Sequence, residues 1–145
     1  MDIRALLKLS EIKEQEINSL RNDFLNLSKI VIDLERNLAE HVSFINKFID
    51  NYANDMNCNN NSMNMLNARV FLQDLNAKSK QLESTKLDAE LQKSAAFDSL
   101  KDSVVELRKL TKVTLKARKL EMEIRARKEF LIDDTLEMHR YNRAS

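Results

Sequence analysis

The chain has 145 residues with no Gly, no Pro and no Trp, and its 24 basic and 23 acidic side chains leave a formal net charge of +1. Without glycine it cannot form a phosphate-cradling loop or a dinucleotide-binding turn, because those turns need a residue that has no Cβ. The lack of both helix-breaking residues, together with 32% charged residues, indicates a few long helices and excludes a globule with a thick core.

We expect the first helix to span about residues 3–55. Its apolar residues recur in alternating steps of three and four, the heptad pattern of a coiled coil, and twelve of fifteen core positions are apolar. The polar exceptions, Ser10, Lys13 and His41, are expected to fix register. The core positions are Ile3, Leu6, Ser10, Lys13, Ile17, Leu20, Phe24, Leu27, Val31, Leu34, Leu38, His41, Ile45, Phe48 and Tyr52.

An asparagine-rich tip follows at about residues 56–62. Eight of the seventeen residues from Asn51 to Asn67 are asparagine, which tolerates the left-handed backbone that a turn needs. Ser62 or an asparagine before it is the expected N-cap of the next helix. Cys58 is the only cysteine, so no intrachain disulfide can form and a reducing cytoplasm is the expected compartment.

The second helix is expected at about residues 63–141, so it is longer than the first. Its core series is less regular, because Lys and Ser residues interrupt it, and it continues through Ile124 and Leu131. The sequence therefore predicts an all-α fold, a long antiparallel two-helix coiled-coil hairpin that forms a single domain over residues 1–145. Its carboxyl-terminal end should overhang, either as a single helix or covered by another subunit at Leu115, Met122, Ile124 and Phe130.

No pattern of catalytic or metal-binding residues is found. His41 and His139 are too far apart to share a metal or an acid–base site, so we expect no enzyme activity, no metal and no cofactor. Residues 108–128 hold nine Lys or Arg, but these are spread around the helix without interleaved aromatics, which disfavours nucleic acid and insertion into lipid. No run of about 18 apolar residues or signal peptide is present.

Aromatic residues flank the tip. Phe44, Phe48 and Tyr52 precede it and Phe71 follows it, with Leu75 one turn later. They either hold the two helices together or form a protein-docking patch, and the pattern favours neither.

In layout and in three local signatures, the chain resembles the FliJ family of flagellar type III export proteins. The first is LLKLSEIKEQEI at residues 6–17. The second is the pair SFINKFIDNYANDM and ARVFLQDLNAKSKQL, on either side of the tip. The third is the basic-then-acidic ending RARKEFLIDDTLEMHRYNR.

The resemblance implies a cytoplasmic coupling protein, peripherally associated with the inner-membrane export apparatus. The intramolecular hairpin itself predicts a chain that is monomeric alone, with an overhang that can promote weak self-association. Its partners would be the export ATPase hexamer, the cytoplasmic domain of the export-gate membrane protein, and export chaperones that it escorts. The positions implied for the gate are Phe44, Phe48, Phe71 and Leu75, although His41 and Lys78 depart from the family pattern beside them. The positions implied for the ATPase are Leu6, Leu9, Glu16, Arg125, Arg127, Lys128, Asp133 and Asp134. The alternatives are a substrate-specific secretion chaperone and a structural coiled-coil adaptor.

Overall fold

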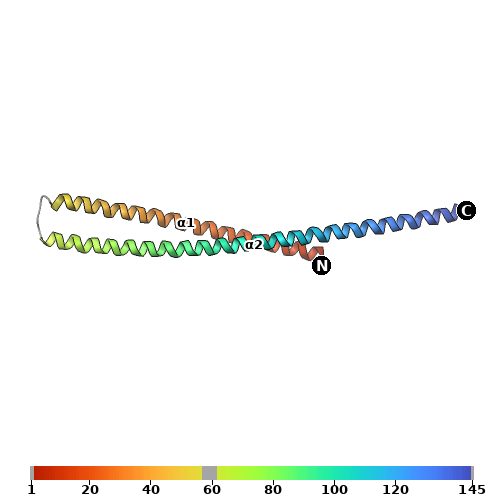
Figure 1. The fold of residues 1–145 in the computed structure, drawn as a ribbon, viewed down its shortest axis with the longest axis horizontal. Helices are drawn as coiled ribbons and strands as arrows, with labels where there is room; N and C mark the ends of the chain where they lie inside the picture. The colour runs from red at the N-terminus through yellow and green to blue at the C-terminus, as the bar shows by residue number, and fades with distance from the viewer. Residues whose placement is uncertain (1, 57–61, 145) are drawn as a thin grey trace. The chain divides into compact units, whose positions relative to one another are not determined.

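The computed structural model describes residues 2–56 and 62–144, which form two α-helices (Figure 1). Helix α1 spans Ile3–Met56 and helix α2 spans Ser62–Ala144, and the described residues contain no strand. The predicted fold class, an antiparallel pair of long helices of which the second is longer, is confirmed. The expected turn at residues 57–61, with Cys58, lies outside the described residues.

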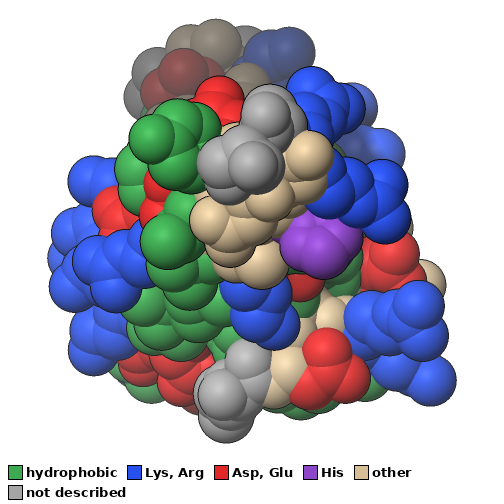
Figure 2. Space-filling view, turned by 90° about the vertical axis from the view of Figure 1, so that its right-hand side faces the viewer, with side chains coloured by type: hydrophobic (Ala, Val, Ile, Leu, Met, Phe, Trp, Pro, Cys, Tyr) green, Lys and Arg blue, Asp and Glu red, His purple; other side chains and the backbone are tan. Residues whose placement is uncertain are grey.

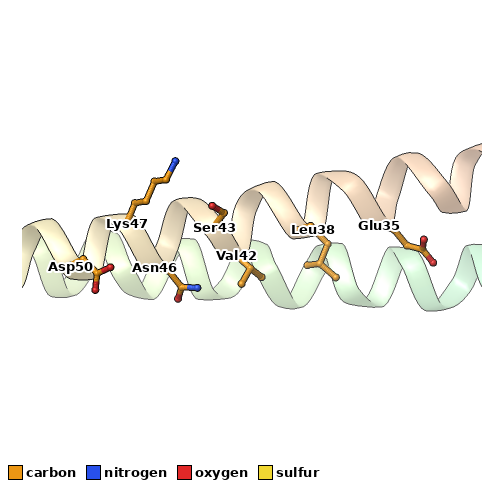
Figure 3. A pocket seen from close by; sticks show the side chains of 8 residues that line it. Glu35, Leu38, Val42, Ser43, Asn46, Lys47 and Asp50 are labelled. Carbon is orange, nitrogen blue, oxygen red and sulfur yellow. The ribbon is translucent and has the colours of Figure 1, made fainter.

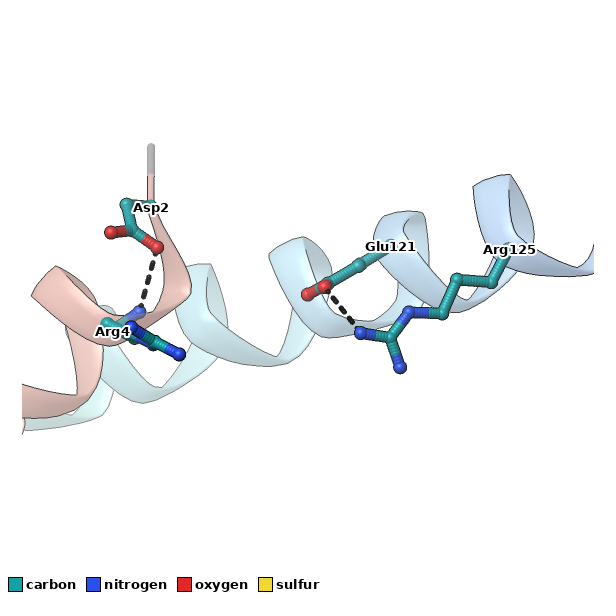
Figure 4. Close-up of polar contacts among 4 residues, drawn as sticks. All are labelled: Asp2, Arg4, Glu121 and Arg125. Atoms are coloured by element: carbon teal, nitrogen blue, oxygen red, sulfur yellow. Dashed lines mark hydrogen bonds and ion pairs between the residues drawn. The ribbon is translucent and has the colours of Figure 1, made fainter. Parts of the chain in front are cut away.

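Asp2 caps the start of α1. Its side-chain Oδ1 accepts a hydrogen bond of 3.2 Å from the backbone N–H of Arg4 (Figure 4). Its carbonyl oxygen accepts one of 3.1 Å from the N–H of Leu6. Because the first N–H groups of a helix have no partner within the helix, this cap favours a start at Ile3.

The coiled-coil core of α1 occupies the predicted positions. All fifteen are buried or half-buried, and Ser28 is the one other described residue of α1 that is not exposed. In α2 the same alternation of steps runs from Ala68 to Ala117, with Val104 as an addition. It includes the polar positions that interrupt the sequence pattern, Ser79, Lys86, Lys93, Ser103 and Thr114.

Contacts between the helices give an antiparallel register. The Nε2–H of His41 donates to the carbonyl oxygen of Leu75 at 2.8 Å, and farther toward the carboxyl end of α1, Phe48 meets Phe71, nearer the amino end of α2. The most buried residues are Leu6, Ile17, Val31 and Ile45 on α1 and Leu75, Ala89, Ser103 and Thr114 on α2. From this register we infer layers that pair them in reverse order, from Leu6 with Thr114 to Ile45 with Leu75.

Contacts group the chain into two compact units. The tip unit is Leu20–Leu100, and the terminal unit is Met1–Ser19 with Lys101–Ser145. In each unit a stretch of α1 packs against a stretch of α2. The expectation of one domain stays a prediction.

In the terminal unit the core ends at Ala117. Every described side chain from Arg118 to Arg143 is exposed, because α1 begins at Ile3 and leaves no residues opposite this stretch. Figure 1 shows the carboxyl-terminal end of α2, in blue, continuing past the start of α1. The predicted overhang is confirmed, and Ile124 and Leu131, which continue the core series in the sequence, lie on its surface.

A lysine occupies one core position of the terminal unit. The Lys13 ammonium pairs with the Glu106 carboxylate on α2 and, at 3.1 Å, with Glu16 on its own helix. The hydrogen bond to Glu106 is the main cause that raises the pKa of Lys13, and the same bond is the main cause that lowers the pKa of Glu106. Lys13 is therefore accommodated because its charged end reaches the rim while its stem stays in the core.

This ion pair makes stability depend on pH at both extremes. Since the pKa of Glu106 is lowered, its contribution is present above the ordinary carboxyl value of 4.5 and is lost as pH falls through the lowered pKa. Since the pKa of Lys13 is raised, its contribution is present below the ordinary value of 10.5 and is lost as pH rises through the raised pKa.

We therefore expect the melting-temperature difference between the wild-type chain and Glu106→Gln to be largest between these limits and to shrink on either side. Circular dichroism melts at several pH values measure it. The control is Glu129→Gln, a carboxylate of α2 beyond the core. An equal difference at pH 3 and pH 7 would show that the pair contributes nothing.

Candidate functional site

An aromatic cluster joins the helices on the tip side of the tip unit. Phe48 packs edge-on against Phe71, with ring centroids 4.9 Å apart and an interplanar angle of 63°. It also stacks with Tyr52, at 6.4 Å and 10°. Phe48 and Tyr52 are core positions, so these rings hold α1 and α2 together.

The four predicted gate residues are close together but differ in exposure. Phe44 is 51% exposed and Phe71 is 43% exposed, so both offer surface to a partner. Leu75 is 9% exposed and packs in the core, where its carbonyl receives the His41 hydrogen bond. A partner docked here can therefore reach Phe44 and Phe71 directly, while Phe48 packs against Phe71 and Leu75 lies in the core.

A groove of about 300 Å³ opens beside the aromatic cluster. It is mainly apolar, and Arg69 is the charged residue in its lining. Ile49, Met65 and Arg69 were not predicted as site residues, because they lie outside the heptad core and the signatures beside the tip do not mark them as contact positions. The lining residues are Phe48, Ile49, Tyr52, Met65, Ala68, Arg69 and Leu72.

A second, shallower groove of about 560 Å³ is lined by α1 residues between Glu35 and Asp50 (Figure 3). Val42 and Asn46 point to the same side in this view, while Lys47 points the opposite way. Glu35 and Asp50, at the two ends of this groove, belong to no metal site. The described residues hold no group of three or more His, Cys, Asp or Glu that could bind a metal. The groove offers a surface and no evident chemistry.

The predicted ATPase residues of α1 have three different environments. Leu6 is 1% exposed and belongs to the core. Leu9 is 46% exposed, and Glu16 is held by Lys13. Leu9 is thus the apolar residue of this set that a partner can touch.

The predicted ATPase residues of α2 all lie in the exposed stretch beyond the core. Arg125 donates to Glu121 one turn earlier at 3.2 Å (Figure 4), and Arg127, Lys128, Asp133 and Asp134 are exposed. Arg125 lies eight residues past Ala117, about 12 Å along the helix. The structure therefore places the two sets in one unit without bringing them into a single cluster.

The tip unit contains a second aromatic contact, which was not predicted from the sequence. The rings of Phe24 and Phe97 are 5.6 Å apart, and the Lys93 ammonium lies 5.9 Å from the centroid of the Phe24 ring. Phe97 directly follows a half-buried core alanine, Ala96. The contact explains how a lysine is accepted at a core position.

The two histidines belong to different units. His41 belongs to the tip unit and is half-buried, whereas His139 is exposed in the terminal unit. Within residues 2–56 and 62–144, no helix has an apolar stretch of the length that crossing a membrane requires.

Comparison of the chain with protein-family models, with curated proteins and with solved structures gave no match.

The different exposure of Phe44 and Phe48 predicts different effects on stability. We expect Phe48→Ala to lower the free energy of unfolding by about 2 kcal/mol, because it removes a half-buried ring with two aromatic neighbours. We expect Phe44→Ala to change it by less than about 0.5 kcal/mol. Urea unfolding followed by circular dichroism measures both, and equal losses would mean that Phe44 also packs in the core.

Proposed function

We propose that this chain is a non-enzymatic coupling protein of the bacterial flagellar type III export apparatus. Its terminal unit binds the ring of the export ATPase, and its tip unit binds the cytoplasmic domain of the export gate. It also escorts export chaperones and works in the cytoplasm at the periphery of the inner membrane. The proposal starts from the resemblance of the sequence to the FliJ family.

The observation that carries the proposal is the exposure of large apolar side chains in both units of a chain that is otherwise strongly charged. Phe44 and Phe71 are exposed in the tip unit, and Phe130 is 71% exposed in the terminal unit. Aromatic side chains are common anchors of protein interfaces, and two helices with one narrow core do not need them on the surface. Such surfaces suit a protein that connects two partners.

The gate-binding surface we propose is Phe44 and Phe71 with the adjoining apolar groove. Ile49 and Met65 line that groove and are each less than half exposed. An apolar side chain of the gate can enter the groove while its neighbours contact the two phenylalanines. Arg69, at the edge, offers a charge-assisted hydrogen bond to a carboxylate or a carbonyl of the gate.

The ATPase-binding surface we propose is the exposed stretch of α2 with Leu9 on α1. Its Arg127 and Lys128 precede Asp133 and Asp134, so the stretch presents a basic region followed by an acidic one. A ring lumen with charges of both signs can recognise this order, and the exposed apolar side chains lose water on insertion.

A substrate-specific secretion chaperone is the second candidate. The apolar groove beside Phe48 favours it, because a chaperone of this kind holds an apolar segment of its client. One-to-one co-purification with a secreted flagellar subunit, in the absence of the ATPase, would support this role over coupling.

For the gate, we expect Phe44→Ala to weaken binding of the purified cytoplasmic gate domain about tenfold in a calorimetric titration, since it removes an exposed aromatic anchor. The matched control is Ile32→Ala, which removes an exposed apolar side chain of α1 away from the groove. Equal affinity for the wild-type chain and Phe44→Ala would exclude this gate surface.

For the ATPase, we expect the double variant Arg127→Glu with Lys128→Glu to bind the purified ATPase hexamer several-fold more weakly and to lose any change in ATP hydrolysis that the wild-type chain causes. The effect should diminish in high salt, because exposed charges are screened. Lys112→Glu with Lys116→Glu makes the same charge change where α2 is paired with α1. If both double variants behave alike, binding responds to net charge and not to this surface.

A further inference from the structure

The exposed stretch of α2 from Arg118 to Arg143, here called the terminal segment, carries its own apolar stripe. The heptad series that forms the core up to Ala117 has three apolar residues in seven when it is continued. A second series uses positions 120, 127, 134 and 141 in place of 121, 128, 135 and 142, and it has five apolar residues in seven. It consists of Leu120, Ile124, Arg127, Leu131, Asp134, Met138 and Tyr141.

The apolar stripe therefore shares Ile124, Leu131 and Met138 with the continued core series and gains Leu120 and Tyr141 on one side of it. Its residues are widely exposed, from 43% at Ile124 to 76% at Tyr141. Near its middle, Phe130 and Leu131 line a shallow apolar depression with Ala126 and Arg127. Figure 2 shows one face of the molecule where hydrophobic side chains gather, with Lys and Arg side chains on both sides. A stripe with 3.5-residue spacing fits a partner helix in a coiled coil.

The charges of the terminal segment change sign along its length. Residues 118–128 hold five Lys or Arg and two Glu, whereas residues 129–139 hold four Asp or Glu and no Lys or Arg, and Arg140 and Arg143 follow at the end of the segment. A parallel pair of identical segments would place like charges side by side. An antiparallel pair places the basic half of each segment against the acidic half of the other.

We propose that the terminal segment pairs antiparallel with the same segment of a second copy of this chain. The two-fold axis lies between residues 130 and 131, so Leu131 of the stripe and the adjacent Phe130 meet their counterparts at the centre. Arg127 then lies within reach of Asp134 of the second copy, and the pair occurs twice by symmetry. These are the two charged residues of the stripe, and each finds the opposite charge in this orientation alone.

This pairing does not rest on the proposed function, because it needs no partner other than the chain itself. It covers residues that the ATPase surface also uses, so pairing and ATPase binding exclude each other. Its test uses the free chain, and a failure there leaves the ATPase and gate experiments unaffected.

Sedimentation equilibrium of the full chain over a range of concentrations tests the pairing. We expect the mass to rise from 16.9 kDa toward twice that value. Arg127→Asp and Asp134→Arg should each weaken the dimer about tenfold or more, because each brings two like charges together twice. The double variant with both changes should return to within about threefold of the wild-type dissociation constant, because antiparallel pairing restores both opposite-charge contacts.

Lys119→Asp is the matched control, since it makes the same charge change in the same half of the segment but outside the stripe. It should weaken the dimer much less than Arg127→Asp. A wild-type chain that stays monomeric at all concentrations, or that forms trimers, overturns the proposal. Single variants that dimerise as tightly as the wild type would also overturn it. So would a double variant whose dimer is as weak as the dimers of the single variants. Circular dichroism of each variant checks that the helices persist.

Discussion

The structure depends on one narrow coiled-coil core, in which buried residues of α1 such as Ile17 and Val31 pack against α2. The buried positions of α2 include the small residues Ala89 and Ser103 as well as the larger Leu75, so the size of the layers varies along the pair. Because each layer buries only one side chain per helix, the rest of each helix remains in water. Surface is therefore abundant in this protein, and docking has to be distinguished from ordinary exposure by the kind of residue exposed.

Several polar residues of the core have a partner close by, which explains why they are tolerated there. The Thr114 hydroxyl donates to the carbonyl of Leu110 at 2.8 Å, so burial leaves it hydrogen-bonded. Lys86 lies 4.0 Å from Glu35 across the helices and 3.8 Å from Glu90 on its own helix. Lys93 reaches the ring of Phe24. Such exceptions occur at single positions of the repeat, where they favour one register over another.

The core of α1 could be predicted from the sequence because heptad spacing alone identifies positions that a partner helix will cover. In α2 the same spacing is obscured at Lys86 and Thr114, and the partner determines that these positions are covered. Spacing could not tell where the core stops: Ile124 continues the series, but α1 has no residue opposite it. For the candidate site, a motif resemblance does not separate Phe44 on the surface from Leu75 in the core, and it assigns no contact to the groove residues Ile49 and Met65.

The aromatic contact of Phe48 with Phe71 also bears on how the chain folds. Its residues are 23 apart in sequence, whereas the Lys13 and Glu106 pair is separated by 93 residues. Closing the shorter loop first costs about 1.2 kcal/mol less chain entropy. We expect the rings to meet early and the remaining layers to close in order away from the turn, so that these phenylalanines belong to the folding nucleus. A side chain placed there for docking would then also set the rate at which the chain folds.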